Sequence, residues 1–240
     1  MSQAAAHAVV YNLNTARALG GDRALAYPLN AWGAGLDEEA GDSLGLMGAR
    51  MSFGRDAEIF GEGEAAEFLY RVVSGAVRTY RILSDGRRQI GEFHLPGDIF
   101  GLEAGSEHLM SAEALTRTEV LVYRRTAVFA LAVRRPAVAQ ALWGATARDL
   151  ERAQAHLMLL GRKSACERVA SFLLALAERQ VSGSEVNLPM SRQDMADYLG
   201  LTIETVSRAF TQLQADGLIA LKGCRCVTLR NRAAFQALVE

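Results

Sequence analysis

The sequence predicts an α+β protein with an antiparallel β domain, a long helix and a C-terminal winged helix-turn-helix. Short apolar stretches that alternate with turn signals indicate the β domain, residues 49–134. One uninterrupted apolar stripe at helical spacing indicates the helix, residues 135–161. Two capped helices around a glycine, followed by a hairpin, indicate the last unit, residues 162–240. Residues 1–48 show no clean period, so we expect a loosely ordered extension with at most one short helix.

Composition excludes several classes of protein. Of the 240 residues 50% are apolar and 22% are charged, which is typical of globular chains and argues against disorder. The chain has neither the roughly eighteen-residue apolar run of a membrane helix nor a signal-peptide pattern. The three cysteines, an odd number that all lie after residue 165, do not make a disulfide framework, so we expect a protein of the reducing cytoplasm. Because the net charge is −1, nucleic-acid binding must rest on a local site.

The β domain is predicted from its spacing of strands and turns. Strands are expected at Glu58–Phe60, Phe68–Val73, Ala76–Tyr80, Ile90–Phe93 and Val120–Tyr123. Gly, Asp and Pro between them suit the backbone angles of tight turns. Many short strands at this spacing are typical of an antiparallel barrel or sandwich. Four arginines surround the turn at Asp85, and we expect a solvated hairpin tip there; they are Arg78, Arg81, Arg87 and Arg88.

The long helix carries an apolar stripe that admits two interpretations. About 25 residues of helix are about 37 Å long, more than one small domain needs. We therefore favour a homodimer over a helix that packs only on its own β domain, although the two uses give the same periodicity. The predicted dimerisation residues are Val138, Leu142, Ala145 and Leu157.

The helix-turn-helix is the strongest signal in the chain. Ser191 and Asp194 form a capping box that starts a helix at Arg192. Gly200 provides the left-handed turn that ends it, and Thr202 caps a second helix. The following stretches, Leu218–Leu221 and Cys224–Leu229, alternate as a hairpin does, so the motif is predicted to be winged.

The second helix has an outward face suited to reading base edges. Arg208 carries two donors for guanine, Glu204 accepts from cytosine or adenine amino groups, and Ser207 bonds either way. Ile203 is placed to contact a thymine methyl. The candidates for backbone contacts are Ser191, Arg192, Thr202, Thr205, Thr211 and Lys222. The alternative is a solvated face with intrahelical pairs, which the caps, turn and wing together argue against.

The stretch Leu201–Leu213, with ETVSR at Glu204–Arg208, resembles the recognition helix of the CRP/FNR superfamily of bacterial transcription regulators. ETVSR favours the FNR and FixK branches, and the stretches from Leu188 through DYLGL and Val227–Arg232 resemble FixK proteins most. The resemblance extends from about Phe53 to Leu229. It implies a cyclic-nucleotide-binding-like jelly roll, a homodimer that reads a TTGAT-N4-ATCAA-like palindrome, and activation of low-oxygen or nitrogen-metabolism genes. A loop like the one at Asp85 touches RNA polymerase in the family, which makes the polymerase an expected partner.

Departures from the family pattern argue against its usual effectors. The chain has three cysteines, all after residue 165, where the iron–sulfur cluster of FNR needs four ligands. By the resemblance, Leu102 stands where cyclic-AMP receptors place a ribose-binding Glu, and Met110 where they place a phosphate-binding Arg. A buried phosphate without a cation is costly, so we expect no cyclic-nucleotide site, no cofactor and no metal.

Two alternatives stay open at this point. One is a regulator of the same family that depends on an effector or on haem, although the four histidines form no local ligand pair. The other is an enzyme that uses Cys224 or Cys226, but no histidine or aspartate constellation accompanies these thiols. Alternate residues of a strand point to opposite faces, so we interpret Cys224 and Cys226 as unrelated thiols. Because these thiols have no catalytic partners in the sequence pattern, we expect that the protein is not an enzyme.

Overall fold

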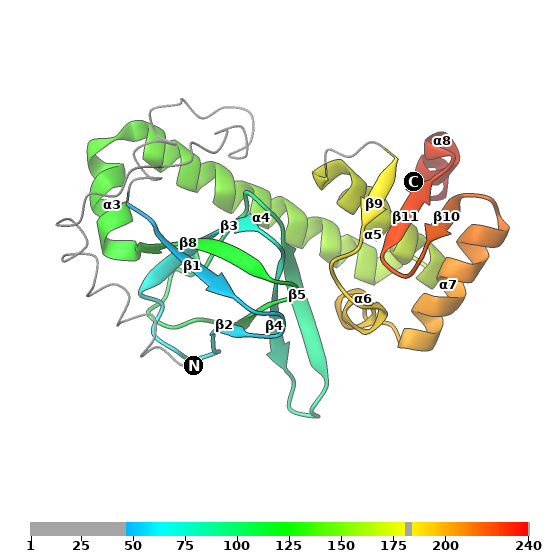
Figure 1. The fold of residues 1–240 in the computed structure, drawn as a ribbon, viewed down its shortest axis with the longest axis horizontal. Coiled ribbons are helices and arrows are strands. Elements are labelled where there is room, and N and C mark those ends of the chain that lie inside the picture. The colour runs from blue at the N-terminus through cyan, green and yellow to red at the C-terminus, as the bar shows by residue number, and fades with distance from the viewer. Residues whose placement is uncertain (1–46, 181–183, 240) are drawn as a thin grey trace. The chain divides into compact units, whose positions relative to one another are not determined.

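The structure is a computed structural model that describes residues 47–180 and 184–239. The predicted N-terminal extension lies almost entirely outside the described residues. The chain divides into two compact units (Figure 1). The N-terminal unit comprises residues up to Arg81 and Glu92–Arg148, and the C-terminal unit comprises Ile82–Gly91 with the residues from Asp149 onward.

The N-terminal unit is a β-roll of two four-stranded sheets with antiparallel pairing. In their spatial order the strands of the first sheet are β1 (Ala49–Phe53), β8 (Thr118–Arg124), β3 (Phe68–Ser74) and β6 (Ile99–Phe100). Those of the second are β2 (Glu58–Phe60), β7 (Ser111–Ala114), β4 (Val77–Ile82) and β5 (Arg88–His94). The five predicted strands are confirmed, and the domain that was expected to be a barrel or a sandwich is a β-roll.

Three strands and one helix of this unit were not predicted from the sequence. Strand β7 is Ser-Ala-Glu-Ala, which has no β-branched or aromatic residue, and β6 has only two residues. Strand β1 forms by pairing with the distant β8 rather than by its own pattern. Helix α3 (Arg125–Arg134) buries only Val128, so it carries almost no one-sided apolar signal.

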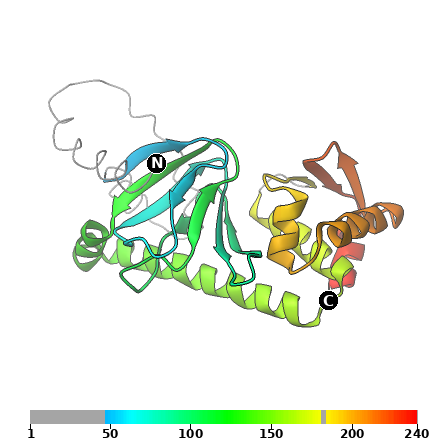
Figure 2. The same cartoon turned by 90° about the horizontal axis from the view of Figure 1, so that it is seen from below.

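The C-terminal unit is built on helices and a small sheet. Helix α4 (Pro136–Arg162) confirms the predicted long helix and ends in this unit. The others are α5 (Ala165–Arg179), α6 (Arg192–Leu199), α7 (Ile203–Ala215) and α8 (Arg232–Val239). Helix α7 packs on α5 and α6, as both views of the ribbon show (Figure 2). The predicted hairpin of β10 (Ile219–Lys222) and β11 (Cys226–Leu229) is confirmed, and β9 (Glu185–Asn187) adds an unpredicted third strand.

The apolar stripe predicted for dimerisation has a different role in the structure. Val138 is fully buried and Ala145 is 5% exposed, and both belong to a core cluster with Leu69 and Tyr123 of the β-roll. Leu142 packs against the same cluster. The assignment of Val138 and Ala145 to a dimer surface is therefore corrected: they anchor α4 inside the N-terminal unit. Leu142 is half-buried and stays a predicted dimerisation residue. Leu157 is 71% exposed and stays a predicted dimerisation residue.

Candidate nucleic-acid interface

The first helix of the motif starts and stops where the sequence indicates. The Oγ atom of Ser191 accepts from the Asp194 amide at 3.0 Å, and the Asp194 carboxylate accepts from the Ser191 amide at 2.9 Å. This is the predicted capping box. Gly200 adopts φ +63°, a left-handed conformation that costs other residues free energy. The Oγ1 atom of Thr202 then accepts from the Thr205 amide and caps α7.

Helix α7 separates into a buried and an open face. Its buried residues are Val206, Ala209, Phe210 and Leu213, which include the three predicted to point inward. The four predicted base-reading residues are all exposed: Ile203, Glu204, Ser207 and Arg208. Because the open face carries a carboxylate, a hydroxyl and a guanidinium near the helix start, it can exchange hydrogen bonds with base edges.

Glu204 is held in its charged form. The pKa of its carboxyl lies below the ordinary value because the Glu204 backbone amide bonds to it, with a smaller effect from the Thr202 side chain. At neutral pH Glu204 is therefore an acceptor only, which suits the amino groups of cytosine or adenine. The hydroxyls of Ser207 and Thr211 donate to carbonyls one turn earlier, Ile203 and Ser207, and keep their lone pairs for acceptance.

Both cations among the predicted phosphate contacts, Arg192 and Lys222, have partners in the structure. The guanidinium of Arg192 lies 3.1 Å from the centroid of the Phe210 ring, and burial lowers its pKa to about 10, so it stays charged at neutral pH. Lys222 pairs with Glu185 of β9, a contact that the sequence does not reveal because the two residues lie far apart in it. Thr202 and Thr205 lie at the start of α7, where the helix dipole favours phosphate.

The thiols of this unit lie on the wing and on α5. Cys224 is exposed in the turn after β10, whereas Cys226 is half-buried at the start of β11. Burial raises the pKa of the Cys166 thiol on α5, which leaves it protonated and poorly nucleophilic. Among the residues that the structure describes, no group of three or more His, Cys, Asp and Glu is placed to hold a metal ion.

The interior of the β-roll is filled by its own rings. His108 stacks on Phe60 with ring centroids 3.6 Å apart, and Tyr70 lies 5.2 Å from the Phe60 ring. The Nδ1 atom of His108 is 3.1 Å from the Glu103 carboxylate. Leu102, the residue in place of an acidic ribose ligand, packs against the apolar cluster under α4.

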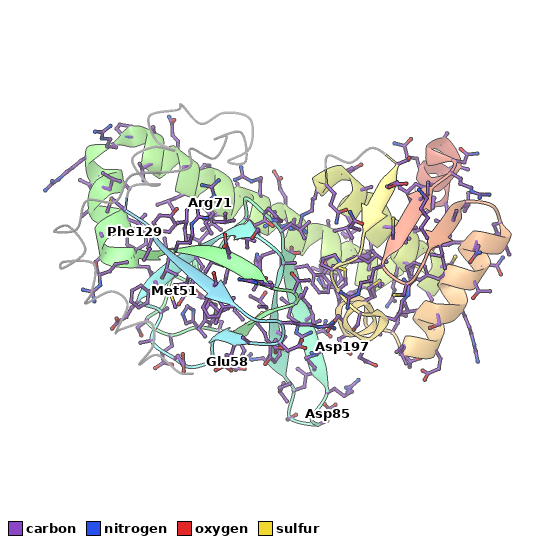
Figure 3. The ribbon with its side chains drawn as sticks, viewed as in Figure 1. Met51, Glu58, Arg71, Asp85, Phe129 and Asp197 are labelled. Atoms are coloured by element: carbon purple, nitrogen blue, oxygen red, sulfur yellow. The ribbon has the colours of Figure 1, made fainter. Side chains whose placement is uncertain are left out.

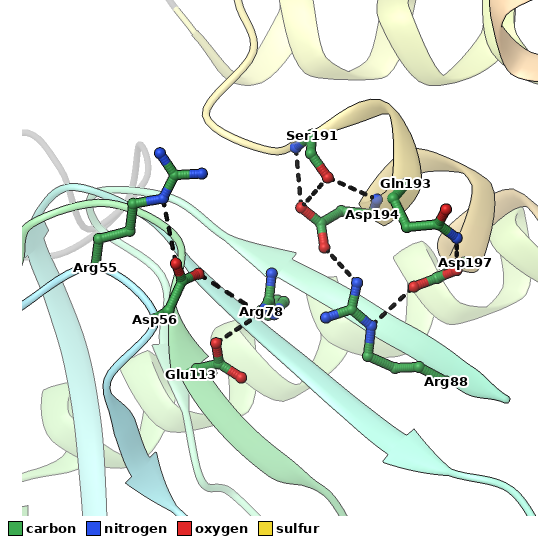
Figure 4. Close-up of polar contacts among 9 residues, drawn as sticks. All are labelled: Arg55, Asp56, Arg78, Arg88, Glu113, Ser191, Gln193, Asp194 and Asp197. Atoms are coloured by element: carbon green, nitrogen blue, oxygen red, sulfur yellow. Dashed lines mark hydrogen bonds and ion pairs between the residues drawn. The ribbon is translucent and has the colours of Figure 1, made fainter. Parts of the chain in front are cut away.

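The hairpin of β4 and β5 is less solvated than its charges predict. Figure 3 marks its tip at Asp85, beside which Arg87 is exposed and paired with that carboxylate. Arg78 is instead buried and contacts Glu113 at 2.5 Å, and Arg88 is paired with two aspartates of α6 (Figure 4). The expectation of a solvated tip is therefore wrong for Arg78 and Arg88, because their partners are distant in sequence.

No helix in the described part of the chain has the length and apolarity needed to cross a membrane. The capped helix pair, its open face and its wing together define a DNA-binding transcription regulator. Residues 50–135 match the model of the cyclic nucleotide-binding domain, and residues 167–238 match that of the Crp-like helix-turn-helix domain.

Known proteins resemble the chain over most of its length. The nitrogen fixation regulation protein FixK of Azorhizobium caulinodans is 47% identical, over 88% of this chain and 90% of that one. The transcriptional activator protein Anr of Pseudomonas protegens is 36% identical, over 69% and 70%. The structure of FixK2 from Bradyrhizobium japonicum superposes with a TM-score of 0.77, at 50% identity, over 80% of this chain and 98% of that one. The chain belongs to the CRP/FNR family of transcription regulators and is similar to its FixK members.

Proposed function

We propose that the protein is a homodimeric transcription activator that reads a TTGAT-N4-ATCAA-like palindrome in genes of low-oxygen respiration or nitrogen metabolism. The open face of α7 carries this proposal, because Glu204, Ser207 and Arg208 are exposed together near the helix start. The relatives named for nitrogen fixation regulation and for activation support the choice of target genes. RNA polymerase is the partner that activation requires, and the cytoplasm is where both act.

The dimer is supported by the solvent face of α4. Trp143, Leu150 and Leu157 are 76%, 58% and 71% exposed, and they follow one another at intervals of seven residues. That spacing is typical of a coiled-coil seam, and large apolar side chains at such exposure call for a covering surface. A second copy of α4 presents the same seam, as a two-fold dimer requires. Two α7 helices would then be held about 34 Å apart for the two half-sites.

Independence from a cyclic nucleotide is supported by the filled interior of the β-roll. Phe60, Tyr70, Phe100 and His108 occupy it with ring-to-ring contacts, and Glu103 is already bonded to His108. An entering nucleotide would have to displace these rings and bury its phosphate among apolar side chains, which costs several kcal/mol. The proposal therefore includes activity without an added ligand.

Titration of the untreated protein tests this proposal. A TTGAT-N4-ATCAA duplex is expected to bind with nanomolar affinity, on the order of 10⁻⁸ M or tighter, at a stated near-physiological salt concentration. Millimolar cyclic AMP should change neither the affinity nor the melting temperature, since a ligand that binds the folded state would raise the latter. A raised melting temperature, or binding only with the nucleotide present, would contradict ligand independence. An absorbance band of haem in the purified protein would contradict it as well.

A further inference from the structure

An arginine at the hairpin that joins β4 and β5 bonds to the helix-turn-helix. Its residues Ile82–Gly91 belong to the C-terminal unit, although both strands continue into the β-roll. The Nη2 atom of Arg88 donates to Oδ1 of Asp194 at 2.7 Å, and its Nε atom donates to Oδ2 of Asp197 at 2.8 Å. Both aspartates lie on α6, three residues apart and therefore on one face of that helix (Figure 4).

The Arg88 bridge is part of a larger polar network on α6. The second oxygen of Asp194 accepts from the Ser191 amide and from its hydroxyl, at 2.9 and 2.7 Å. The second oxygen of Asp197 accepts from Gln193 at 2.7 Å. The side chains of Asp194 and Asp197 are only 5% and 13% exposed, so water contributes little to balancing their charge. Arg88 is the cation that compensates them.

This polar network lies beside residues that are proposed to contact the DNA backbone. The Asp194 carboxylate bonds directly to Ser191, which is a proposed phosphate contact, and Arg192 follows at the start of the same helix. Without Arg88, the two carboxylates would lose this compensation close to the proposed phosphate contacts, and like charges repel. The hairpin residues Leu83, Arg87 and Arg88 line one pocket with Ile203 and Glu204 at the start of α7, and these two base-reading residues remain exposed.

We propose that Arg88 is a positioning residue for DNA binding, which fixes the hairpin to α6 and neutralises Asp194 and Asp197 beside the phosphate contacts. The effect acts on the DNA backbone, and it therefore applies to any duplex sequence. The inference rests on DNA binding by this motif and not on the identity of the palindrome.

The test compares Arg88→Gln with Arg87→Gln, which removes the same charge from an exposed neighbour that pairs with Asp85. Arg88→Gln is expected to weaken binding to palindromic and scrambled duplexes alike, by about five- to tenfold, with a smaller effect at high salt. Arg87→Gln should change the affinity less than twofold. Arg88→Lys keeps the charge but loses the planar fork, so we expect an intermediate affinity.

A double variant separates the electrostatic role from a loss of folding. Adding Asp197→Asn to Arg88→Gln removes one uncompensated carboxylate and should restore most of the lost affinity, which a merely unfolded helix would not regain. Equal effects of the Arg88 and Arg87 variants, or no restoration in the double variant, would overturn the proposal. If the protein has no preference for the proposed palindrome, the wild type would instead bind both duplexes with equal affinity.

Discussion

Replacement of Arg208 with alanine is expected to weaken binding to the palindrome strongly while leaving binding to a scrambled duplex unchanged. Arg208 is exposed on the open face of α7, and its side chain is the one proposed to donate two bonds to guanine. A good base contact contributes about 1–3 kcal/mol, and a dimer makes it in both half-sites. The expected loss in affinity for the palindrome is therefore roughly thirtyfold or more.

The Arg208 variant needs a control from the same helix. Gln214→Ala alters another exposed residue of α7, which lies near the C-terminal end of the helix and should leave the affinity within about twofold. Because Arg208 is exposed, its loss should not change the melting temperature by more than a degree or two. Equal weakening on both duplexes would mean that Arg208 contacts phosphate, and an unchanged palindrome affinity would contradict its base-reading role.

Replacement of Leu157 with lysine is expected to convert the dimer into monomers and to weaken palindrome binding about a hundredfold or more. Leu157 is 71% exposed in the chain, so the substitution leaves the fold of the protomer intact. In a seam formed by two copies of α4 it would bring two ammonium groups together among apolar side chains, which is strongly unfavourable. Monomers then bind two half-sites independently and lose the advantage of a linked second contact.

Sedimentation equilibrium measures this outcome, with Ala155→Lys as the matched control. Ala155 is exposed two residues earlier on α4 and lies off the seven-residue series of Trp143, Leu150 and Leu157. It should leave the mass of the dimer unchanged. A dimer that persists in both Leu157→Lys and Leu150→Lys would place the subunit interface elsewhere on the chain.

The helix-turn-helix was predictable because its signals are local. The capping box of Ser191 and Asp194, the left-handed Gly200 and the cap at Thr202 each involve residues within a few positions of one another. The two faces of α7 follow from helical spacing alone. These features could be assigned before any tertiary contact was known.

The features that sequence reasoning missed depend on contacts across the chain. Strand β9 exists because it pairs with β11, and the two ion pairs of Arg88 join residues about a hundred positions apart. The stripe of Val138 and Ala145 was assigned to a partner because a helix that packs on its own domain has the same period as one in a dimer. Because Val138 and Ala145 are buried within the protomer and Trp143 is exposed, the expected dimer seam moves to the face of α4 that carries Trp143.

Selection from a random pool of duplexes tests whether the protein reads the palindrome without a ligand. The purified wild-type protein, without added ligand, would be incubated with the pool, and the bound duplexes would be sequenced. We predict an enriched palindrome with TTGAT and ATCAA half-sites separated by four base pairs, and its loss when Arg208→Ala is used. Enrichment of an unrelated or single half-site, or no enrichment at all, would contradict the account of a ligand-independent dimer that reads DNA through α7.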